Sequence, residues 1–192
     1  MKAISIMDGG IKIPSDSAQN VIEKIKERES EVERLNAMKD SIISNLSCNG
    51  EFKNLIDQIK MEIVNEGLRI EMMESNDDVF FEIGTSELRP EAQKLLVEIG
   101  KNLSVISNKL IIEGHTDSRP YSNDGRGYTN FELSVDRANS ARRIIVSGGL
   151  DSGRIDEVRG YADTRLLDKN DPFNLVNRRI SIIIKFATEA PK

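Results

Sequence analysis

Two neighbouring stretches of sequence decide the fold of this chain. Residues 109–117 read KLIIEGHTD, and residues 129–138 read TNFELSVDRA. The first is a short apolar run that ends at a glycine, which is typical of a buried strand. The second opens with the Thr-x-x-Glu pattern of a helix capping box. Together they predict a strand, a loop and a helix whose N-terminus faces the strand end, where α/β sheets usually bind ligands.

Strands and helices alternate on both sides of these stretches. Pro90 is suited to the first position of a helix, and residues 154–161 and 179–186 are expected to form the last two strands. Upstream, residues 68–74 and 79–83 are expected to pair as a β-hairpin, after a short helix at 51–61. This order predicts an α/β (α+β) two-layer sandwich with helices over one sheet.

A long helix is expected before this domain, because residues 17–49 contain no glycine or proline. Apolar residues recur there mostly at spacings of three, four or seven; they are Val21, Ile22, Ile25, Val32, Leu35, Met38, Ile42 and Leu46. We interpret the stripe as a coiled-coil arm that joins two copies. The alternative is a helix folded back on its own domain. The expected organisation is a flexible leader at 1–16, a helical dimerisation arm at 17–66, the α/β domain at 67–187 and a tail at 188–192.

Composition narrows the class of protein. The chain has 192 residues, of which 38% are hydrophobic and 31% charged, and its formal net charge is −5. An acidic chain is not suited to nucleic acid as its main partner, since phosphate binding requires a basic face. Cys48 is the only cysteine, so an intrachain disulfide is excluded. No apolar run approaches the roughly 20 residues that span a bilayer.

The candidate site combines opposite charges at the strand end. Asp117 supplies a carboxylate, Arg137 a guanidinium and Asn130 an amide, beside the N–H donors of a helix start. A carboxylate and a guanidinium held across a crevice suit a zwitterionic ligand, because the first takes an ammonium group and the second a carboxylate. Two alternatives stay open: Asp117 pairs with Arg137 itself, or Asp117 caps a turn.

Catalysis and metal binding fit these residues poorly. A triad of Ser134, His115 and Asp117 would place two members almost adjacent in the chain, without an oxyanion-hole glycine motif. His115 is the only histidine, so a metal there would lack further histidine or cysteine ligands. We therefore expect no catalytic residue, no metal and no cofactor, and we expect His115 to hold the loop that presents Asp117.

In order and spacing, four motifs resemble the OmpA-like peptidoglycan-binding domain family. They are Gly114-His115-Thr116-Asp117, Asn130-x-x-Leu133-Ser134-x-x-Arg137-Ala138, Gly160-Tyr161-Ala162 and Asn177-Arg178-Arg179-Ile180. The resemblance covers roughly residues 68–186 and implies a β/α/β/α/β domain. It also implies a ligand, the diaminopimelate of the peptidoglycan stem peptide.

The resemblance assigns roles residue by residue. Asp117 and Arg137 would grip the ammonium–carboxylate centre of diaminopimelate. Three residues would line the pocket: Thr116, Asn130 and Leu133. One arginine of the pair Arg178 and Arg179 would add positive charge.

The loop after Asp117 further resembles the wall-anchoring region of flagellar stator proteins of the MotB type, a branch of this family. Ala162-Asp163-Thr164 and Asp171-Pro172-Phe173 are similar to the same branch. This implies a periplasmic location, a homodimer and a MotA-type stator partner, with attachment to the inner membrane through a span missing from this chain. The alternative is a general OmpA-type wall-tethering protein without a motor role.

Overall fold

The computed structural model describes residues 15–75, 80–82, 84–121 and 127–187. Its longer elements are α1 Ser15–Cys48, β1 Ile59–Val64, β2 Gly67–Met73, α2 Pro90–Leu103, β3 Leu110–His115, α3 Asn130–Ser147, β4 Ile155–Gly160 and β5 Arg179–Lys185. Short 3-10 helices cover Gly50–Phe52, Ile56–Gln58, Ser152–Arg154 and Leu175–Asn177.

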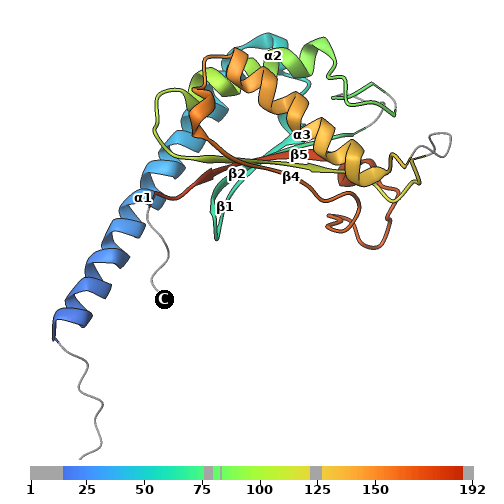
Figure 1. Ribbon diagram of the computed structural model, residues 1–192. Helices are drawn as coiled ribbons and strands as arrows, with labels where there is room; N and C mark the ends of the chain where they lie inside the picture. Colours follow the sequence, from blue (N-terminus) through green and yellow to red (C-terminus); the bar gives the residue numbers. More distant parts are fainter. Residues whose placement is uncertain (1–14, 76–79, 83, 122–126, 188–192) are drawn as a thin grey trace, which may run out of the picture.

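A five-stranded sheet in the order β1-β2-β5-β3-β4 carries the fold. Neighbouring strands run antiparallel, except β3 and β4, which are parallel and are connected through α3. Helices α2 and α3 lie over one face of the sheet (Figure 1). Aliphatic side chains of both layers form the core, among them Leu68, Ile70, Leu95, Leu96, Ile99, Leu110, Ile112, Ile182 and Ile184. The predicted two-layer α/β sandwich is confirmed.

Helix α3 lies so close to the sheet that two strand positions require glycine. A Cβ added to Gly114 in β3 would lie 2.0 Å from the backbone oxygen of Ser134. A Cβ added to Gly160 in β4 would lie 2.3 Å from Cγ2 of Val135. Because glycine has no side chain, the first turns of α3 can rest directly on the ends of both strands.

Helix α1 is docked on the domain along only part of its length. Three side chains of its C-terminal part are almost fully buried in the core: Leu35, Ile42 and Leu46. Val21, Ile22 and Ile25 instead keep 44%, 53% and 42% of their surface exposed. Figure 1 shows the N-terminal part of α1, in blue, leading away from the sheet. The folded-back alternative is therefore right for the C-terminal part, and an exposed apolar stripe is left on the N-terminal part.

Polar contacts mark the point where α1 meets the domain. Nη2 of Arg28 donates to the backbone oxygen of Asn65 at 2.8 Å, and the guanidinium lies 3.1 Å from the ring centroid of Phe186. One turn later, Oε1 of Glu31 accepts from Nδ2 of Asn108 at 3.1 Å. These contacts join α1 to the β1–β2 turn, to the segment before β3 and to the end of β5.

The expected helix at 51–61 is wrong. Residues 59–64 form β1, in which apolar Ile59, Met61 and Ile63 alternate with Lys60 and Glu62, the period of a half-buried strand. Because β1 pairs antiparallel with β2, it takes the place in the hairpin that was expected for residues 79–83.

Within residues 79–83, Phe81 forms an isolated bridge with Leu88. The sheet thus begins at Ile59, inside the segment predicted as a helical arm at 17–66. Helix α1 begins at Ser15, two residues inside the predicted leader. The rest of that leader and the tail at 188–192 lie outside the described residues. In the part of the chain that the structure describes, no helix is long and apolar enough to cross a membrane.

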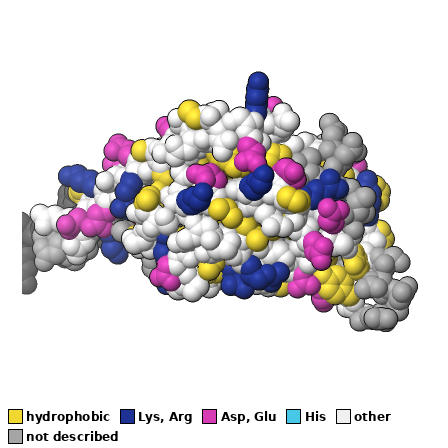
Figure 2. All heavy atoms as spheres, turned by 90° about the horizontal axis from the view of Figure 1, so that it is seen from above, with side chains coloured by type: hydrophobic (Ala, Val, Ile, Leu, Met, Phe, Trp, Pro, Cys, Tyr) yellow, Lys and Arg dark blue, Asp and Glu magenta, His cyan; other side chains and the backbone are white. Residues whose placement is uncertain are grey.

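Figure 2 looks down onto the helical layer and shows that Lys and Arg side chains are interspersed with Asp and Glu side chains over this face. Neither sign of charge dominates it. The distribution of charge on this face therefore does not mark a binding site, and a cavity that brings several polar groups together is a better candidate.

Candidate functional site

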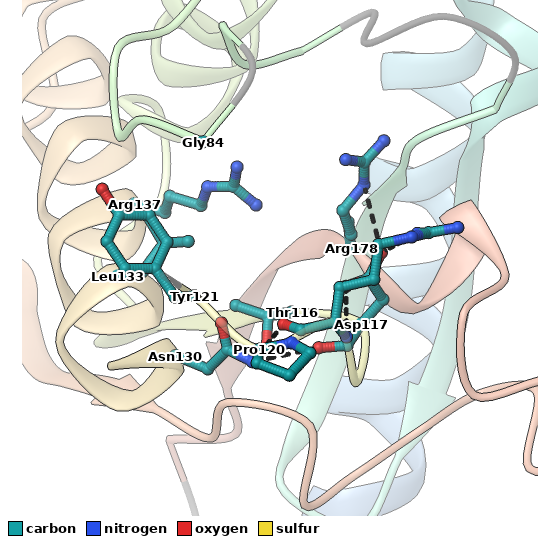
Figure 3. Close-up of a pocket in the computed structure, with 10 residues that line it drawn as sticks. Gly84, Thr116, Asp117, Pro120, Tyr121, Asn130, Leu133, Arg137 and Arg178 are labelled. Atoms are coloured by element: carbon teal, nitrogen blue, oxygen red, sulfur yellow. Dashed lines mark hydrogen bonds and ion pairs between the residues drawn. The ribbon is translucent and has the colours of Figure 1, made fainter. Parts of the chain in front are cut away.

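A pocket of about 360 Å³ lies beside the N-terminal part of α3. Its lining consists of Gly84, Thr116, Asp117, Arg119, Pro120, Tyr121, Asn130, Leu133, Arg137 and Arg178. Six of the seven residues predicted for the site are in this set: Thr116, Asp117, Asn130, Leu133, Arg137 and Arg178. Figure 3 shows Arg137 projecting from α3 on one wall and Arg178 on the opposite wall, with Asp117 below Arg178.

The start of α3 positions three of these side chains. The predicted capping box is present: the hydroxyl of Thr129 accepts from the backbone N–H of Phe131 at 3.2 Å, and the carboxylate of Glu132 accepts from the backbone N–H of Thr129 at 2.7 Å. Residues 130, 133 and 137 are spaced to lie on one face of the helix. That face forms one wall of the pocket.

Asn130 ties this wall to the loop after β3. Its Nδ2 donates to the backbone oxygen of Arg119 at 2.9 Å and lies 3.4 Å from that of Asp117. Thr116, at the start of the loop, donates its backbone N–H to the oxygen of Ala162 at 2.9 Å. The loop is therefore fixed to the segments on both sides of it.

Asp117 is only 4% exposed as a residue, and cationic groups surround its carboxylate. Its Oδ1 accepts from the backbone N–H of Arg119 at 3.0 Å, and its Oδ2 forms an ion pair with Nη1 of the same residue. Nε of Arg178 lies 3.9 Å from Oδ2 and 2.7 Å from Oε2 of the buried Glu74. The alternative in which Asp117 pairs with Arg137 is therefore wrong. The alternative in which Asp117 caps a turn is right, because its Oδ1 accepts from the backbone N–H two residues further on.

Arg137 is 3% exposed, and its guanidinium points into the pocket (Figure 3). Its Nε donates to the backbone oxygen of Thr85 at 2.9 Å, and its Cζ lies 4.5 Å from the ring centroid of Phe81. Burial lowers the pKa of Arg137, and the nearby Glu74 opposes this shift. The group stays charged at neutral pH because arginine starts from a very high pKa.

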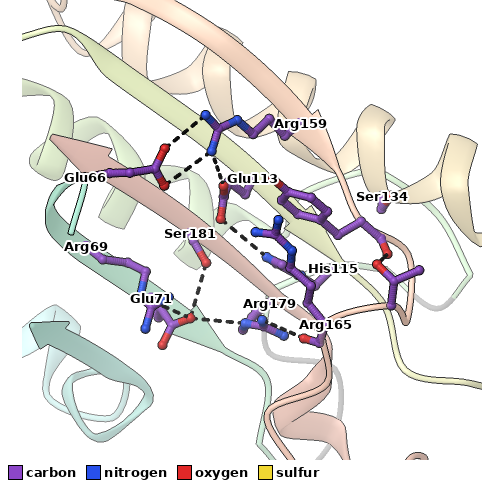
Figure 4. A network of polar contacts seen from close by, with 12 residues as sticks. Glu66, Arg69, Glu71, Glu113, His115, Ser134, Arg159, Arg165, Arg179 and Ser181 are labelled. Carbon is purple, nitrogen blue, oxygen red and sulfur yellow. Dashed lines mark hydrogen bonds and ion pairs between the residues drawn. The ribbon is translucent and has the colours of Figure 1, made fainter. Parts of the chain in front are cut away.

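Arg179 does not line the pocket, although it was named beside Arg178. Because neighbouring strand residues point to opposite faces, Arg179 points to the other side of the sheet. There its Nε donates to Oε1 of Glu71 at 3.1 Å, and its Nη2 donates to the backbone oxygen of Arg165 at 2.9 Å (Figure 4). It belongs to a buried structural network that also contains Ser181.

His115 belongs to the same face as Arg179. Its ring is 2% exposed and stacks on Tyr161 with 5.3 Å between centroids. Nε2 lies 3.8 Å from Oε2 of Glu113, beyond hydrogen-bond distance. Arg159 in turn donates to Glu113 at 2.9 Å and to Glu66 at 3.1 Å (Figure 4). Burial lowers the pKa of His115 below its usual value, although the charge of Glu113 opposes this.

The hydroxyl of Ser134 is committed to backbone contacts. It donates to the oxygen of Phe131 at 2.8 Å and accepts from the N–H of Ala162 at 3.1 Å. Ala162 has a positive φ of 48°, which is uncommon for a residue with a side chain. Ser134 therefore holds the turn after β4, a structural role that differs from that of a nucleophile.

Several residues that shape the site were not found from the sequence. Arg119, Pro120 and Tyr121 fall in the loop predicted between the strand and the helix, but no role in the site was predicted for any of them. Glu74, in the predicted hairpin, holds Arg178, and Thr85, just after that hairpin, holds Arg137. Their contribution depends on tertiary contacts, which no local sequence motif predicts.

Comparison with known proteins identifies the family. The OmpA family matches residues 80–179. Motility protein B of Escherichia coli K12 is 37% identical over 163 residues, which is 85% of this chain and 53% of that protein. The peptidoglycan-associated lipoprotein of Pseudomonas putida is 29% identical over 104 residues, 54% of this chain and 60% of that protein. The crystal structure of a MotB-like protein from Desulfovibrio vulgaris superposes on this structure with a TM-score of 0.68 at 21% sequence identity. The superposition covers 83% of this chain and 98% of the Desulfovibrio chain, which supports the fold.

The chain belongs to the OmpA family. Within that family its similarity extends to the MotB branch, since the match to motility protein B covers most of the chain. The chain spans about half the length of the curated motility proteins it matches. Members of this family are structural, peptidoglycan-binding proteins, so the expectation that the chain is not an enzyme is confirmed.

The lowered pKa of His115 leads to a prediction about stability. Below its usual pKa of 6.5 the unfolded chain takes up a proton at this residue that the folded chain resists, so the free energy of unfolding should fall as the pH decreases from about 7 to about 5.5. One proton limits the slope to about 1.4 kcal/mol per pH unit. Urea unfolding at several pH values measures it.

Replacement of the histidine is the control for this prediction. Since the chain has a single histidine, the variant His115→Gln should lose most of the pH dependence in this range. A wild-type unfolding free energy that stays flat from pH 7 to pH 5.5 would contradict the prediction.

Proposed function

We propose that the pocket binds peptidoglycan through the ammonium–carboxylate centre of diaminopimelate in the stem peptide. The observation that carries this proposal is Arg137. It is a buried guanidinium that points into the pocket, and in the described part of the chain no carboxylate lies within ion-pair distance of it. A ligand carboxylate would supply the missing partner, and the fork of the guanidinium suits it.

The charges around the pocket favour a ligand with both signs. In the part of the chain that the structure describes, the guanidinium groups of Arg119, Arg137 and Arg178 meet the carboxylates of Asp117 and Glu74. Glu74 is engaged by Arg178, whereas Oδ2 of Asp117 pairs with the exposed side chain of Arg119. Asp117 can therefore take a ligand ammonium group once the Arg119 side chain moves aside. Asp117 and Arg137 would therefore hold the two ends of the zwitterion, while Thr116, Asn130 and Leu133 shape the space between them.

The size of the pocket fits one amino-acid end group. Its volume of about 360 Å³ lies near the lower end of the range for small-ligand pockets, roughly 300–1,000 Å³. The relative from Pseudomonas putida is named for its association with peptidoglycan, which supports the wall as the source of the ligand. A single such contact is expected to be weak, because the cost of removing charged groups from water offsets much of their attraction.

Binding to the wall is tested by co-sedimentation with purified sacculi that contain diaminopimelate. The variant Asp117→Asn removes one charge with almost no change of shape, and Arg137→Gln replaces the guanidinium by a shorter neutral amide. Loss of one partner of a charged hydrogen bond costs about 1.5–3 kcal/mol. We therefore expect each variant to bind at least about tenfold more weakly than the wild type.

Matched controls separate the pocket from general charge effects. Asp57 and Arg143 are exposed residues outside the pocket lining, so Asp57→Asn and Arg143→Gln should pellet with the wall as the wild type does. Circular dichroism shows whether each variant is folded. Folded pocket variants that pellet as well as the wild type would refute the proposal.

We also propose that two copies associate through the exposed stripe on the N-terminal part of α1. Peptidoglycan repeats its ligand, and two linked pockets can raise avidity by about 10²–10⁴. The double variant Ile22→Asp/Ile25→Asp should shift a concentration-dependent dimer to a monomer in analytical ultracentrifugation. Val105→Asp, at a residue that is 81% exposed on the domain, is the control. A wild-type chain that is monomeric at all accessible concentrations would rule out this dimer.

We further propose that the chain anchors a flagellar stator in the periplasm, with a MotA-type partner and an inner-membrane span in the full-length protein. The identity of 37% to motility protein B over 85% of this chain supports this role. Joined to a membrane span from a stator protein, the chain should restore swimming to a strain that lacks its own wall-anchoring stator subunit. The same fusion with Asp117→Asn should restore it poorly. Wall binding without any swimming would favour the general wall-tethering alternative.

A further inference from the structure

We propose that Arg119 is a specificity-determining residue of the pocket, because its side chain competes with the ligand ammonium group for Asp117. This inference rests on the proposed function and adds a role for a residue outside the family motifs. In the unliganded pocket the ammonium position beside Oδ2 of Asp117 is taken by Nη1 of Arg119. A ligand that uses Asp117 must first displace this group.

The two partners of this ion pair differ in their freedom to move. The side chain of Asp117 is 6% exposed, whereas that of Arg119 is 55% exposed. Long exposed side chains change rotamer without disturbing the core. Arg119 is therefore the partner that moves, and Asp117 is the fixed one.

The backbone of Arg119 stays in place when its side chain leaves. Its oxygen accepts from Nδ2 of Asn130 at 2.9 Å, and its N–H donates to Oδ1 of Asp117 at 3.0 Å. Pro120 follows and restricts the conformation of the residue before it. Displacement thus concerns the side chain alone, and Asp117 keeps one hydrogen bond throughout.

A second resting place for the guanidinium lies close by. Its Cζ is 5.5 Å from the ring centroid of Phe173, within the range of a cation–π contact. The ring of Phe173 is itself half exposed. The displaced side chain can therefore keep this contact while it turns away from Asp117.

The ion pair has opposite consequences for two kinds of ligand. For a zwitterion it is a competitor, so its presence lowers affinity. For a ligand that offers a carboxylate to Arg137 but no ammonium to Asp117, it is helpful, because it neutralises a nearby carboxylate that would repel the ligand. Removing the guanidinium should therefore change the two affinities in opposite directions, which a merely structural role would not do.

Isothermal titration calorimetry with two soluble tripeptides tests this. The first is L-Ala-γ-D-Glu-meso-diaminopimelate, and the second carries 2-aminopimelate, which keeps the terminal carboxylate but lacks the second amino group. Exposed ion pairs contribute up to about 1 kcal/mol, so Arg119→Gln should bind the first peptide about two- to fivefold more tightly. The same variant should bind the second peptide more weakly than the wild type does.

Two further variants act as controls. Arg119→Lys keeps a cation and should return both affinities toward the wild-type values. Arg165→Gln removes an exposed arginine that lies over Tyr161 on the other side of the sheet and should change neither.

The possible outcomes separate this inference from the proposed function. If wild type binds the diaminopimelate peptide and Asp117→Asn weakens it, the proposed function stands. In that case, weaker binding by Arg119→Gln would show that Arg119 holds the ligand, and unchanged binding would show that the pair does not compete; either result overturns the inference alone. A wild-type chain that binds neither peptide nor sacculi overturns both.

Discussion

The contact between α3 and the ends of two strands is the constraint on which the site depends. Gly114 and Gly160 let the helix backbone lie where a methyl group would clash with Ser134 or Val135. Any side chain at residue 114 would push α3 away from β3 and separate Arg137 from the loop that carries Asp117. The hydroxyl of Ser134, which bonds to Ala162, fixes the same junction from inside. Site geometry is thus set by close backbone packing before any charged group contributes.

Buried charge is the second constraint, and it acts on both faces of the sheet. Asp117 and Glu74 can lie below the surface because guanidinium groups surround them. On the opposite face Glu71 and Glu113 are held in the same way by Arg179 and Arg159. Removing one member of such a pair leaves an uncompensated charge, which is costly. The pocket differs from the opposite face in one respect: its most buried arginine, Arg137, contacts a backbone oxygen and a ring, and among the residues that the structure describes no carboxylate forms an ion pair with it.

The sequence correctly predicted those elements that are determined by short-range sequence patterns. The run 109–117 and the capping box at Thr129 placed β3 and α3, and with them Asp117, Asn130, Leu133 and Arg137. Prediction from the sequence was wrong where one stretch of residues is compatible with two different structures. Residues 59–64 alternate as a strand does, but their first three residues were assigned to the short helix expected at 51–61, whose apolar residues also fit a helical spacing. For Arg178 and Arg179, a shift of one residue reverses the face, so only the register of β5 shows which arginine reaches the pocket. Glu74 and Thr85 reach it through tertiary contacts that no local pattern encodes.

The partial docking of α1 links the pocket to what a wall anchor must do. A 34-residue helix is about 51 Å long, and its contacts with the domain begin near Arg28 and Glu31. Roughly the first third therefore extends from the domain with its apolar residues uncovered, at the far end of the molecule from the pocket. The exposed apolar residues of α1 lie at a distance from the pocket. A second copy that associates through them can therefore add a second pocket without blocking the first. In the proposed dimer, the strength of wall attachment would come from two weak contacts acting together, and α1 would set the distance between them.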